Sequence, residues 1–161
     1  MPNWCENRLA ISGDVADVKA FIKKGLNEKG EWCLDNYHPM PKEYHNDDRW
    51  YDWRLANWGT KWDVDAEVNE DDDVIHFLSA WSPPIEWLHK VGVEHPHLSF
   101  RLTFVEGGCW FAGMTEIIDG EVIGDSMCEP MYVNEDGDEL DPNEIDWDTD
   151  FAMLVCPYDY E

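Results

Sequence analysis

The chain has 161 residues, and its 36 Asp and Glu against 11 Lys and Arg give a formal net charge of −25. This length suits one domain over residues 1–161, and a hydrophobic fraction of 43% argues against a disordered chain. The charge disfavours direct binding to DNA, RNA or an anionic membrane, because those partners are bound by Lys and Arg. A basic protein surface fits the sign of the charge.

The first strand and helix are predicted from local patterns. Residues 3–12 are typical of a strand that ends at a Gly-Asp pair. Asp14 is a suitable N-cap for a helix over residues 15–26, in which apolar side chains recur every three or four positions. Residues 31–37 are then predicted to form a second strand.

Residues 42–68 form an insert that is rich in aromatic and charged side chains. Asp47 or Asp48 is expected to cap a short helix within it. Residues 64–68 alternate apolar and acidic side chains, which predicts an exposed strand. An acidic turn is expected at residues 69–73.

The next strand and helix follow directly after this turn. Residues 74–81 carry little charge and are predicted to be a central strand. Pro83 and Pro84 are expected to open a helix at Ile85, because proline suits the first turn of a helix. Residues 98–105 alternate apolar and polar side chains and predict a further strand.

The remaining residues are expected to form hairpins and an acidic C-terminal segment. Asp119–Gly120 lies between two alternating runs, which predicts a hairpin over residues 109–127. Asp136–Gly137 indicates one more hairpin or loop. Residues 140–161 are acidic but contain scattered apolar side chains, so we expect them to pack against the rest of the protein.

The order of these elements predicts an α+β fold. Strand, helix, strand, insert, strand, helix and strand together make a ferredoxin-like β-α-β-β-α-β sandwich, with an antiparallel sheet and helices on one face. Its core is expected over residues 1–105, with the insert at 42–68. Residues 106–161 are predicted to form an acidic β-hairpin extension.

No leader, membrane span or disulfide pattern is apparent in the sequence. Residues 1–8 lack the basic segment and apolar run of a signal peptide, and no stretch has the roughly 18 apolar residues of a membrane span. We therefore expect a cytoplasmic protein. The five cysteines are odd in number and lie far apart, so we expect reduced and mostly buried thiols.

Four sequence strings occur in a fixed order over residues 1–105. They are Met1-Pro2-Asn3-Trp4-Cys5-Glu6-Asn7, Pro39-Met40-Pro41, Asn57-Trp58-Gly59-Thr60-Lys61-Trp62-Asp63 and Ala80-Trp81-Ser82-Pro83-Pro84. Together they resemble the YubB-like family of phage and plasmid proteins. That resemblance implies a ferredoxin-like fold of unknown function, a mobile-element origin and a bacterial host cell. It implies no catalytic residues.

The insert supports two interpretations. Its tryptophans fall within thirteen residues, at Trp50, Trp53, Trp58 and Trp62. They are expected to fill the core, since Trp buries a large apolar area. Alternatively they form an aromatic site for a small ligand or a peptide, while the acidity of the chain serves solubility only. The residues of this alternative site are Trp58, Lys61 and Trp62.

We expect neither an enzyme nor a metal or cofactor site. The sequence contains no Gly-x-Ser-x-Gly, His-Glu-x-x-His, Walker or Gly-x-Gly-x-x-Gly motif. His95 and His97 lack a third ligand with matching spacing. If Gly137 is aligned with the sixth position of an EF-hand loop, Tyr132 and Asn143 stand where acidic ligands are needed.

The charge is concentrated in the C-terminal third. Residues 106–161 carry −17 without any Lys or Arg, whereas residues 1–105 carry −8. The leading hypothesis is that this acidic surface binds the basic surface of a host nucleic-acid-processing protein. As a DNA or RNA mimic it would inhibit a CRISPR or restriction system.

The acids that would supply phosphate-like charges lie within residues 116–150, and Trp147 would serve as an apolar anchor. A free sheet edge also allows a homodimer. The candidate partner-binding acids are Glu116, Asp119, Glu121, Asp125, Glu135, Asp136, Asp138, Glu139, Asp141, Glu144, Asp146 and Asp148.

Overall fold

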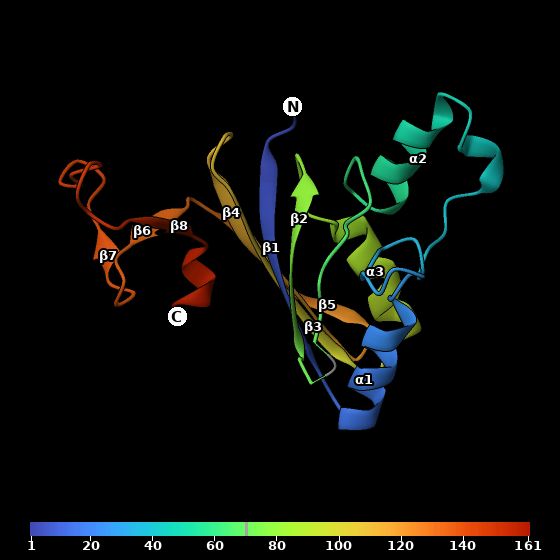
Figure 1. Cartoon of the computed structure of the whole chain (residues 1–161). Coiled ribbons are helices and arrows are strands. Elements are labelled where there is room, and N and C mark those ends of the chain that lie inside the picture. Colours follow the sequence, from blue (N-terminus) through green and yellow to red (C-terminus); the bar gives the residue numbers. More distant parts are fainter. Residues whose placement is uncertain (70) are drawn as a thin grey trace.

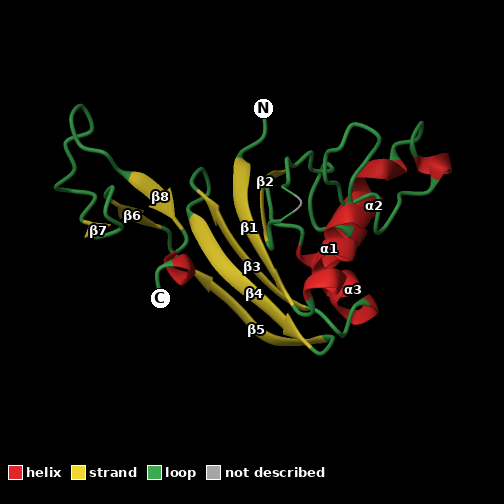
Figure 2. Ribbon diagram, turned by 60° about the horizontal axis from the view of Figure 1, so that its bottom comes forward, coloured by secondary structure: helices red, strands yellow, loops and turns green. Residues whose placement is uncertain are grey.

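A computed structural model describes residues 1–69 and 71–161, and in them five strands form one antiparallel sheet, the large sheet. Its order is β2-β1-β3-β4-β5. Three helices gather on one face of this sheet (Figures 1 and 2). The α+β class with helices on one face is therefore confirmed. The bounds are β1 (Trp4–Ser12), β2 (Val74–Ala80), β3 (Ser99–Glu106), β4 (Phe111–Ile118), β5 (Glu121–Cys128), α1 (Val15–Lys24), α2 (Arg49–Asn57) and α3 (Ile85–Glu94).

The core lies between the large sheet and the helices. Strand β1 alternates, so that Cys5, Leu9 and Ile11 are buried. Helix α1 begins where the Asp14 side chain accepts a hydrogen bond from the backbone N–H of Ala16 at 2.9 Å, as its N-cap position predicts. The helices add further large apolar side chains to this core: Val18, Phe21 and Ile22 from α1, and Trp87, Leu88 and Val91 from α3.

A smaller sheet lies on the opposite face of the large sheet (Figures 1 and 2). It contains β6 (Met131–Val133), β7 (Glu139–Leu140) and β8 (Met153–Val155) in the order β7-β6-β8. Residues 129–161, here called the C-terminal lobe, include this sheet and a 3₁₀ helix. That helix is η2 (Pro157–Asp159), and a similar short helix, η1 (Lys42–Tyr44), precedes α2.

Contacts with β3 and β4 attach the C-terminal lobe to the large sheet. The Arg101 guanidinium donates a hydrogen bond to the Tyr158 carbonyl at 3.0 Å, and the Thr103 hydroxyl donates one to the Asp159 carboxylate at 2.6 Å. Cys156 is buried in a small apolar cluster, and its thiol donates to the Gly113 carbonyl at 3.3 Å. The lobe therefore packs on the protein, as expected for residues 140–161.

The predicted strand at residues 31–37 is wrong. Trp32 forms only isolated bridges, with Leu26 and with Ala66, in the described part of the chain. The Asp63 carboxylate accepts hydrogen bonds from the backbone N–H groups of Leu34 and Asp35, at 2.7 and 3.1 Å, in place of a neighbouring strand. Of the expected strand at residues 64–68, only the bridge between Ala66 and Trp32 is present. Glu70, in the expected acidic turn, lies outside the described residues.

Strands β4 and β5 extend the large sheet instead. The Asp119–Gly120 turn between them is confirmed, with φ angles of 53° and 78° that suit a tight hairpin. Ala112 and Ile117 of β4 are buried, so residues beyond 105 contribute to the core. Strand β2, predicted to be central, lies at the edge of the sheet. No helix in residues 1–69 and 71–161 is long and apolar enough to cross a membrane.

Candidate functional site

The string from Asn57 to Asp63 joins the end of α2 to the connection between β2 and α3. The Thr60 hydroxyl donates to the Ala80 carbonyl at 3.0 Å, and the Ser82 hydroxyl donates to the Gly59 carbonyl at 2.6 Å. Gly59 has a φ of +82°, a conformation that favours glycine. Two of the four distinctive strings of the sequence therefore hydrogen-bond to each other.

Asp63, the acidic residue of this string, stabilises the fold through hydrogen bonds to its side chain. Its carboxylate accepts backbone hydrogen bonds from Leu34 and Asp35, and a further one from Val64 at 2.7 Å. Removal from water raises the pKa of the Asp63 carboxyl from its ordinary value of 3.8 to about 6, although these hydrogen bonds act in the opposite direction. Asp63 is thus a structural anchor for the loop that replaces the expected second strand.

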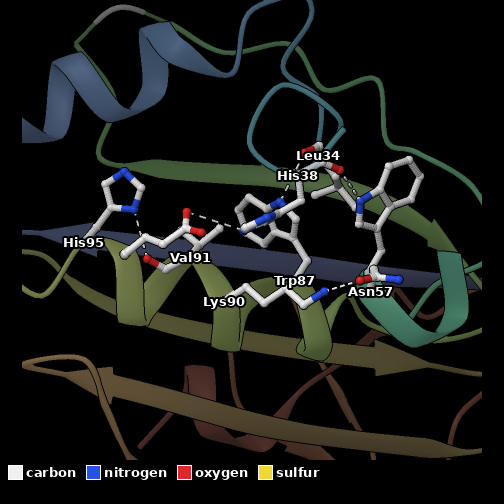
Figure 3. Close-up of polar contacts among 9 residues, drawn as sticks. Leu34, His38, Asn57, Trp87, Lys90, Val91 and His95 are labelled. Atoms are coloured by element: carbon white, nitrogen blue, oxygen red, sulfur yellow. Dashed lines mark hydrogen bonds and ion pairs between the residues drawn. The ribbon is translucent and has the colours of Figure 1, made fainter. Parts of the chain in front are cut away.

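Figure 3 shows how α3 holds the same loop and the start of the string. The Trp87 indole donates to the Leu34 carbonyl at 3.3 Å, and the Lys90 ammonium donates to the Asn57 side-chain carbonyl. His38 Nε2 lies 3.6 Å from the Glu94 carboxylate. Burial lowers the pKa of His38, which favours its neutral form, and Glu94 opposes this shift.

The histidines do not assemble a metal centre in the described part of the chain. His95 Nδ1 lies 2.9 Å from the Val91 carbonyl of its own helix, and its ring is 6.0 Å from that of His97. In residues 1–69 and 71–161, no group of three or more His, Cys, Asp or Glu side chains is placed to hold a metal ion. Cys5, Cys33 and Cys156 are buried free thiols, whereas Cys109 is exposed.

The alternative ligand residues Trp58, Lys61 and Trp62 occupy different environments. Trp58 is 1% exposed, and its indole donates to the His38 carbonyl at 3.0 Å. Trp62 is 37% exposed, and the Lys61 ammonium lies 4.8 Å from the centre of its ring. The Trp62 ring is also 6.1 Å from the exposed ring of Trp4. Trp58 therefore belongs to the core, while Lys61 and Trp62 lie at the surface.

Two further residues, Arg54 and Trp50, lie beside these. The sequence analysis did not consider Arg54, and it counted Trp50 among the tryptophans of the insert without assigning it to the site. Arg54 lines a pocket of about 310 Å³ together with Met40, His45, Trp50 and Trp62. Its guanidinium carbon lies 5.2 Å from the ring centres of both Trp50 and Trp58. Trp50 and Arg54 are four residues apart on α2, and Trp58, four residues further on, is its C-cap. This spacing was a signal in the sequence that could have identified them.

The predicted acidic residues fall into two groups. Glu116, Asp119, Glu121 and Asp125 lie on β4, β5 and their turn, and the other eight lie in the C-terminal lobe. The β4–β5 turn lies at the helical side of the large sheet, whereas the lobe covers the opposite face (Figures 1 and 2). Within the first group, Glu116 forms an ion pair with Arg101 at 3.4 Å.

The acids of the C-terminal lobe lie on turns in which side chains accept hydrogen bonds from backbone N–H groups of the same turn. The Asn134 side-chain carbonyl accepts hydrogen bonds from the backbone N–H groups of Asp136 and Asp138, each at 2.9 Å. Asp150 accepts from the Asp146 backbone N–H at 2.9 Å. Among the described residues, no Lys or Arg lies within ion-pair distance of an acidic side chain of this lobe. Its charge is therefore not compensated locally.

An aromatic cluster lies among these acids. The rings of Trp110 and Tyr132 are 5.8 Å apart, and those of Tyr132 and Trp147 meet edge to face at 5.2 Å. Trp147 is 60% exposed and Trp110 is 40% exposed. Phe151, which follows the last acid of this segment, is also largely exposed. The lobe thus combines exposed aromatic rings with a surrounding negative charge.

A separate cavity of about 430 Å³ lies between β1–β3 and the C-terminal lobe. Its polar lining includes Arg8, His76 and Thr103 from the large sheet and Asp159 from the lobe. Because charges of both signs line this cavity, its chemistry favours no single class of ligand.

Comparison with known proteins identifies a matching family. No curated protein and no solved structure is similar to the chain at a significant level. The profile of one protein family, described as "Ferredoxin-like domain in Api92-like protein", matches residues 57–150. The match runs from the end of α2 through β2, α3 and β3–β7 into the acidic segment, and so covers more than half of the chain. The protein therefore belongs to the family of ferredoxin-like domains in Api92-like proteins.

Proposed function

We propose that the protein binds the basic surface of a nucleic-acid-processing protein through its C-terminal lobe. The observation that carries this proposal is the cluster of Trp110, Tyr132 and Trp147, whose two indoles are exposed beside acids that form no ion pair with Lys or Arg among the described residues. Protein interfaces commonly combine aromatic anchors at the centre with a charged or polar rim. A lobe with no Lys or Arg requires a partner that supplies them.

The amount of charge supports mimicry of DNA or RNA. Duplex DNA carries one negative charge per ~1.7 Å of its axis, so 25 charges match those of roughly 43 Å of duplex. A chain of this length has a radius of gyration of about 15 Å, which corresponds to a globule roughly 40 Å across. An acidic surface on such a globule approaches the charge density of the duplex and would fit a groove that binds nucleic acid.

The biological setting is part of the same proposal. The resemblance of residues 1–105 to YubB-like proteins supports an origin in a phage or plasmid, and therefore action in the cytoplasm of a bacterial host. A mobile element benefits when a CRISPR or restriction nuclease of its host is blocked. We infer that such a nuclease is the partner, and that the protein acts by occupying its nucleic-acid groove rather than by catalysis.

The test compares two variants with the same change in net charge. The lobe variant carries Glu135→Lys, Asp136→Lys, Asp138→Lys and Glu139→Lys. The control variant carries the same reversals at exposed acids of the N-terminal half, Glu28, Asp48, Asp65 and Glu67. Each tagged protein is used to capture partners from a host lysate, with elution along a salt gradient and duplex DNA as competitor.

We expect the unmodified protein and the control variant to retain a nucleic-acid enzyme that elutes at high salt and is displaced by DNA. The lobe variant is expected to lose it and to show a weaker dependence of binding on salt. The proposal is wrong if the lobe variant binds as well as the control, or if DNA does not compete. Circular dichroism of both variants checks that they are folded.

A further inference from the structure

The pocket beside α2 differs in charge from the rest of the molecule. It is lined by Met40, His45, Trp50, Arg54 and Trp62, so no carboxylate belongs to its lining in the described part of the chain. The chain as a whole carries 36 acidic residues. A concave site lined by an arginine, a histidine and two indoles therefore contrasts with the prevailing negative surface. Its volume of about 310 Å³ lies within the range of small-molecule sites.

Arg54 is held in place by aromatic rings on its own helix and at the end of that helix. Its guanidinium lies 5.2 Å from the ring centres of Trp50 and Trp58, within the distance for cation–π attraction. Trp58 is itself fixed, because it is buried, donates to the His38 carbonyl and meets Trp53 edge to face at 5.6 Å. The orientation of the guanidinium is thus set before any ligand arrives, which lowers the entropic cost of binding.

The side-chain donors of Arg54 have no hydrogen-bond partner among the described residues. Its Nε is buried without an acceptor among the described residues, and no carboxylate of residues 1–69 and 71–161 lies within ion-pair distance of its guanidinium. Arg49 on the same helix differs, because it forms an ion pair with Asp47 at 2.6 Å. Stacking uses the faces of a guanidinium and leaves its N–H edge free, which suits the two oxygens of a carboxylate or phosphate.

Trp62 supplies an exposed aromatic surface at the same pocket. Its ring is 37% exposed, and the Lys61 ammonium lies 4.8 Å from the ring centre. Trp4, 6.1 Å away, extends this surface beyond the pocket. Exposed indoles stack with planar rings, and this stacking stabilises bound aromatic compounds in water. The pocket therefore offers an anion-binding group and a stacking surface side by side.

We propose that this pocket binds a small anion that carries an aromatic ring. The carboxylate or phosphate of the ligand forms hydrogen bonds with Arg54, and its ring stacks on Trp62. A nucleotide and an aromatic carboxylate share this chemistry. Helix α2, which carries Trp50 and Arg54, lies on the opposite side of the large sheet from the C-terminal lobe (Figure 1). Binding at this pocket does not depend on the partner proposed for that lobe.

The experiment titrates the ¹⁵N-labelled full-length protein with defined probes and follows its indole and arginine N–H signals by NMR. The probes are adenosine monophosphate and indole-3-acetate, with adenosine and inorganic phosphate as fragments that lack one half of the chemistry. The test variants are Arg54→Met and Trp62→Ala, and the matched control is Arg49→Met on the same helix. The lobe variant with four charge reversals serves as a second control.

We expect at least one of the two anionic probes to shift the Arg54 and Trp62 signals and to bind at least tenfold more tightly than adenosine or phosphate. The tighter of the two identifies the anionic group that the site prefers. Arg54→Met and Trp62→Ala should each weaken binding at least tenfold, and Arg49→Met and the lobe variant should change it less than twofold. If Arg54→Met does not fold, Trp62→Ala decides, because that ring is partly exposed.

The proposal is overturned if neither anionic probe shifts these signals, or if adenosine or phosphate alone binds as tightly as the complete probe. It is equally overturned if Arg49→Met weakens binding as much as Arg54→Met, since the effect would then come from general charge. Loss of binding in the lobe variant would assign the probe to the acidic lobe rather than to the pocket.

Discussion

The insert and the C-terminal lobe carry the two most distinctive parts of the sequence, and the fold uses them in opposite ways. In the insert, Thr60 and Asp63 direct their polar atoms inward to backbone partners of other segments. In the lobe, side chains such as Asp136 and Asp138 are exposed, and the turns that carry them are closed by neighbouring residues. The distinctive residues of the insert stabilise the fold, whereas those of the lobe remain exposed and available to bind a partner.

This difference determines what a mutation can report. A substitution in the string from Asn57 to Asp63 removes contacts between segments far apart in sequence, so it alters stability first. Among the described residues, an exposed acid of the lobe forms no ion pair with Lys or Arg, so its substitution leaves the fold intact. Binding measurements are therefore easiest to interpret in the lobe and at the surface residues of the insert.

Truncation of Trp58 should have the largest effect on stability. The Trp58→Ala variant loses a side chain that is 1% exposed and leaves a cavity beneath Arg54, so we expect a loss of about 3–5 kcal/mol. Trp62→Ala, which alters a partly exposed ring of the same string, should cost less than about 1 kcal/mol. Urea denaturation followed by far-ultraviolet circular dichroism measures both. Equal losses would contradict the distinction between a buried and a surface tryptophan.

Truncation of Asp63 should have the next largest effect. The Asp63→Ala variant leaves the backbone N–H groups of Leu34, Asp35 and Val64 without their acceptor, and each unsatisfied buried donor costs ~1–3 kcal/mol. Partial access to water should limit the total to about 3 kcal/mol. The same denaturation measurement tests this, with Asp65→Ala as the exposed control. A loss no larger than that of the control would show that Asp63 does not hold the loop.

The role of Asp63 also explains what could be predicted from the sequence. Helix α1 and the β4–β5 hairpin follow from the N-cap at Asp14 and the turn at Asp119–Gly120, which act within a few residues. The segment at residues 31–37 has the pattern of a strand, but its backbone donors are taken by a carboxylate 28 and 29 residues away. A long-range side chain replaced the expected ladder, and local periodicity contains no information about it.

The candidate sites also depend on tertiary contacts that the sequence pattern does not contain. The negative charge of residues 106–161 could be counted from the sequence, but its division between the β4–β5 hairpin and the lobe depends on how the chain reverses after β5. The helical spacing of Trp50, Arg54 and Trp58 was visible in advance. That Arg54 has no carboxylate partner among the described residues depends on tertiary structure, and this is what turns an aromatic string into a candidate pocket.

The raised pKa of Asp63 predicts that the free energy of unfolding depends on pH. Its pKa is about 6 in the folded protein and 3.8 ordinarily, so the folded state holds this proton more tightly than the unfolded state. The stabilisation from this group is therefore fully present below about pH 4 and is lost as pH rises through 6. The total change is at most about 3 kcal/mol.

The measurement compares the free energy of unfolding of the unmodified protein with that of the Asp63→Asn variant between pH 4 and pH 8. The variant carries no titratable group at this position, so the difference between the two proteins isolates Asp63 from the other acids. We expect the unmodified protein to lose stability relative to the variant as pH rises through 6. A constant difference across this range would contradict a raised pKa.

The smallest change in stability is expected in the lobe. Replacing Glu135, Asp136, Asp138 and Glu139 by their neutral amides should change the free energy of unfolding by about 0.5 kcal/mol or less, because these side chains are exposed and their turn is closed by hydrogen bonds from backbone N–H groups to the Asn134 side chain. The sign should be favourable at low salt, since the substitutions reduce repulsion within a lobe that has no cations. Denaturation at low and high salt should show this gain disappearing as salt rises. A loss of stability above 1 kcal/mol would mean that the acids hold the lobe together as Asp63 holds the insert, and the contrast between the two regions would fail.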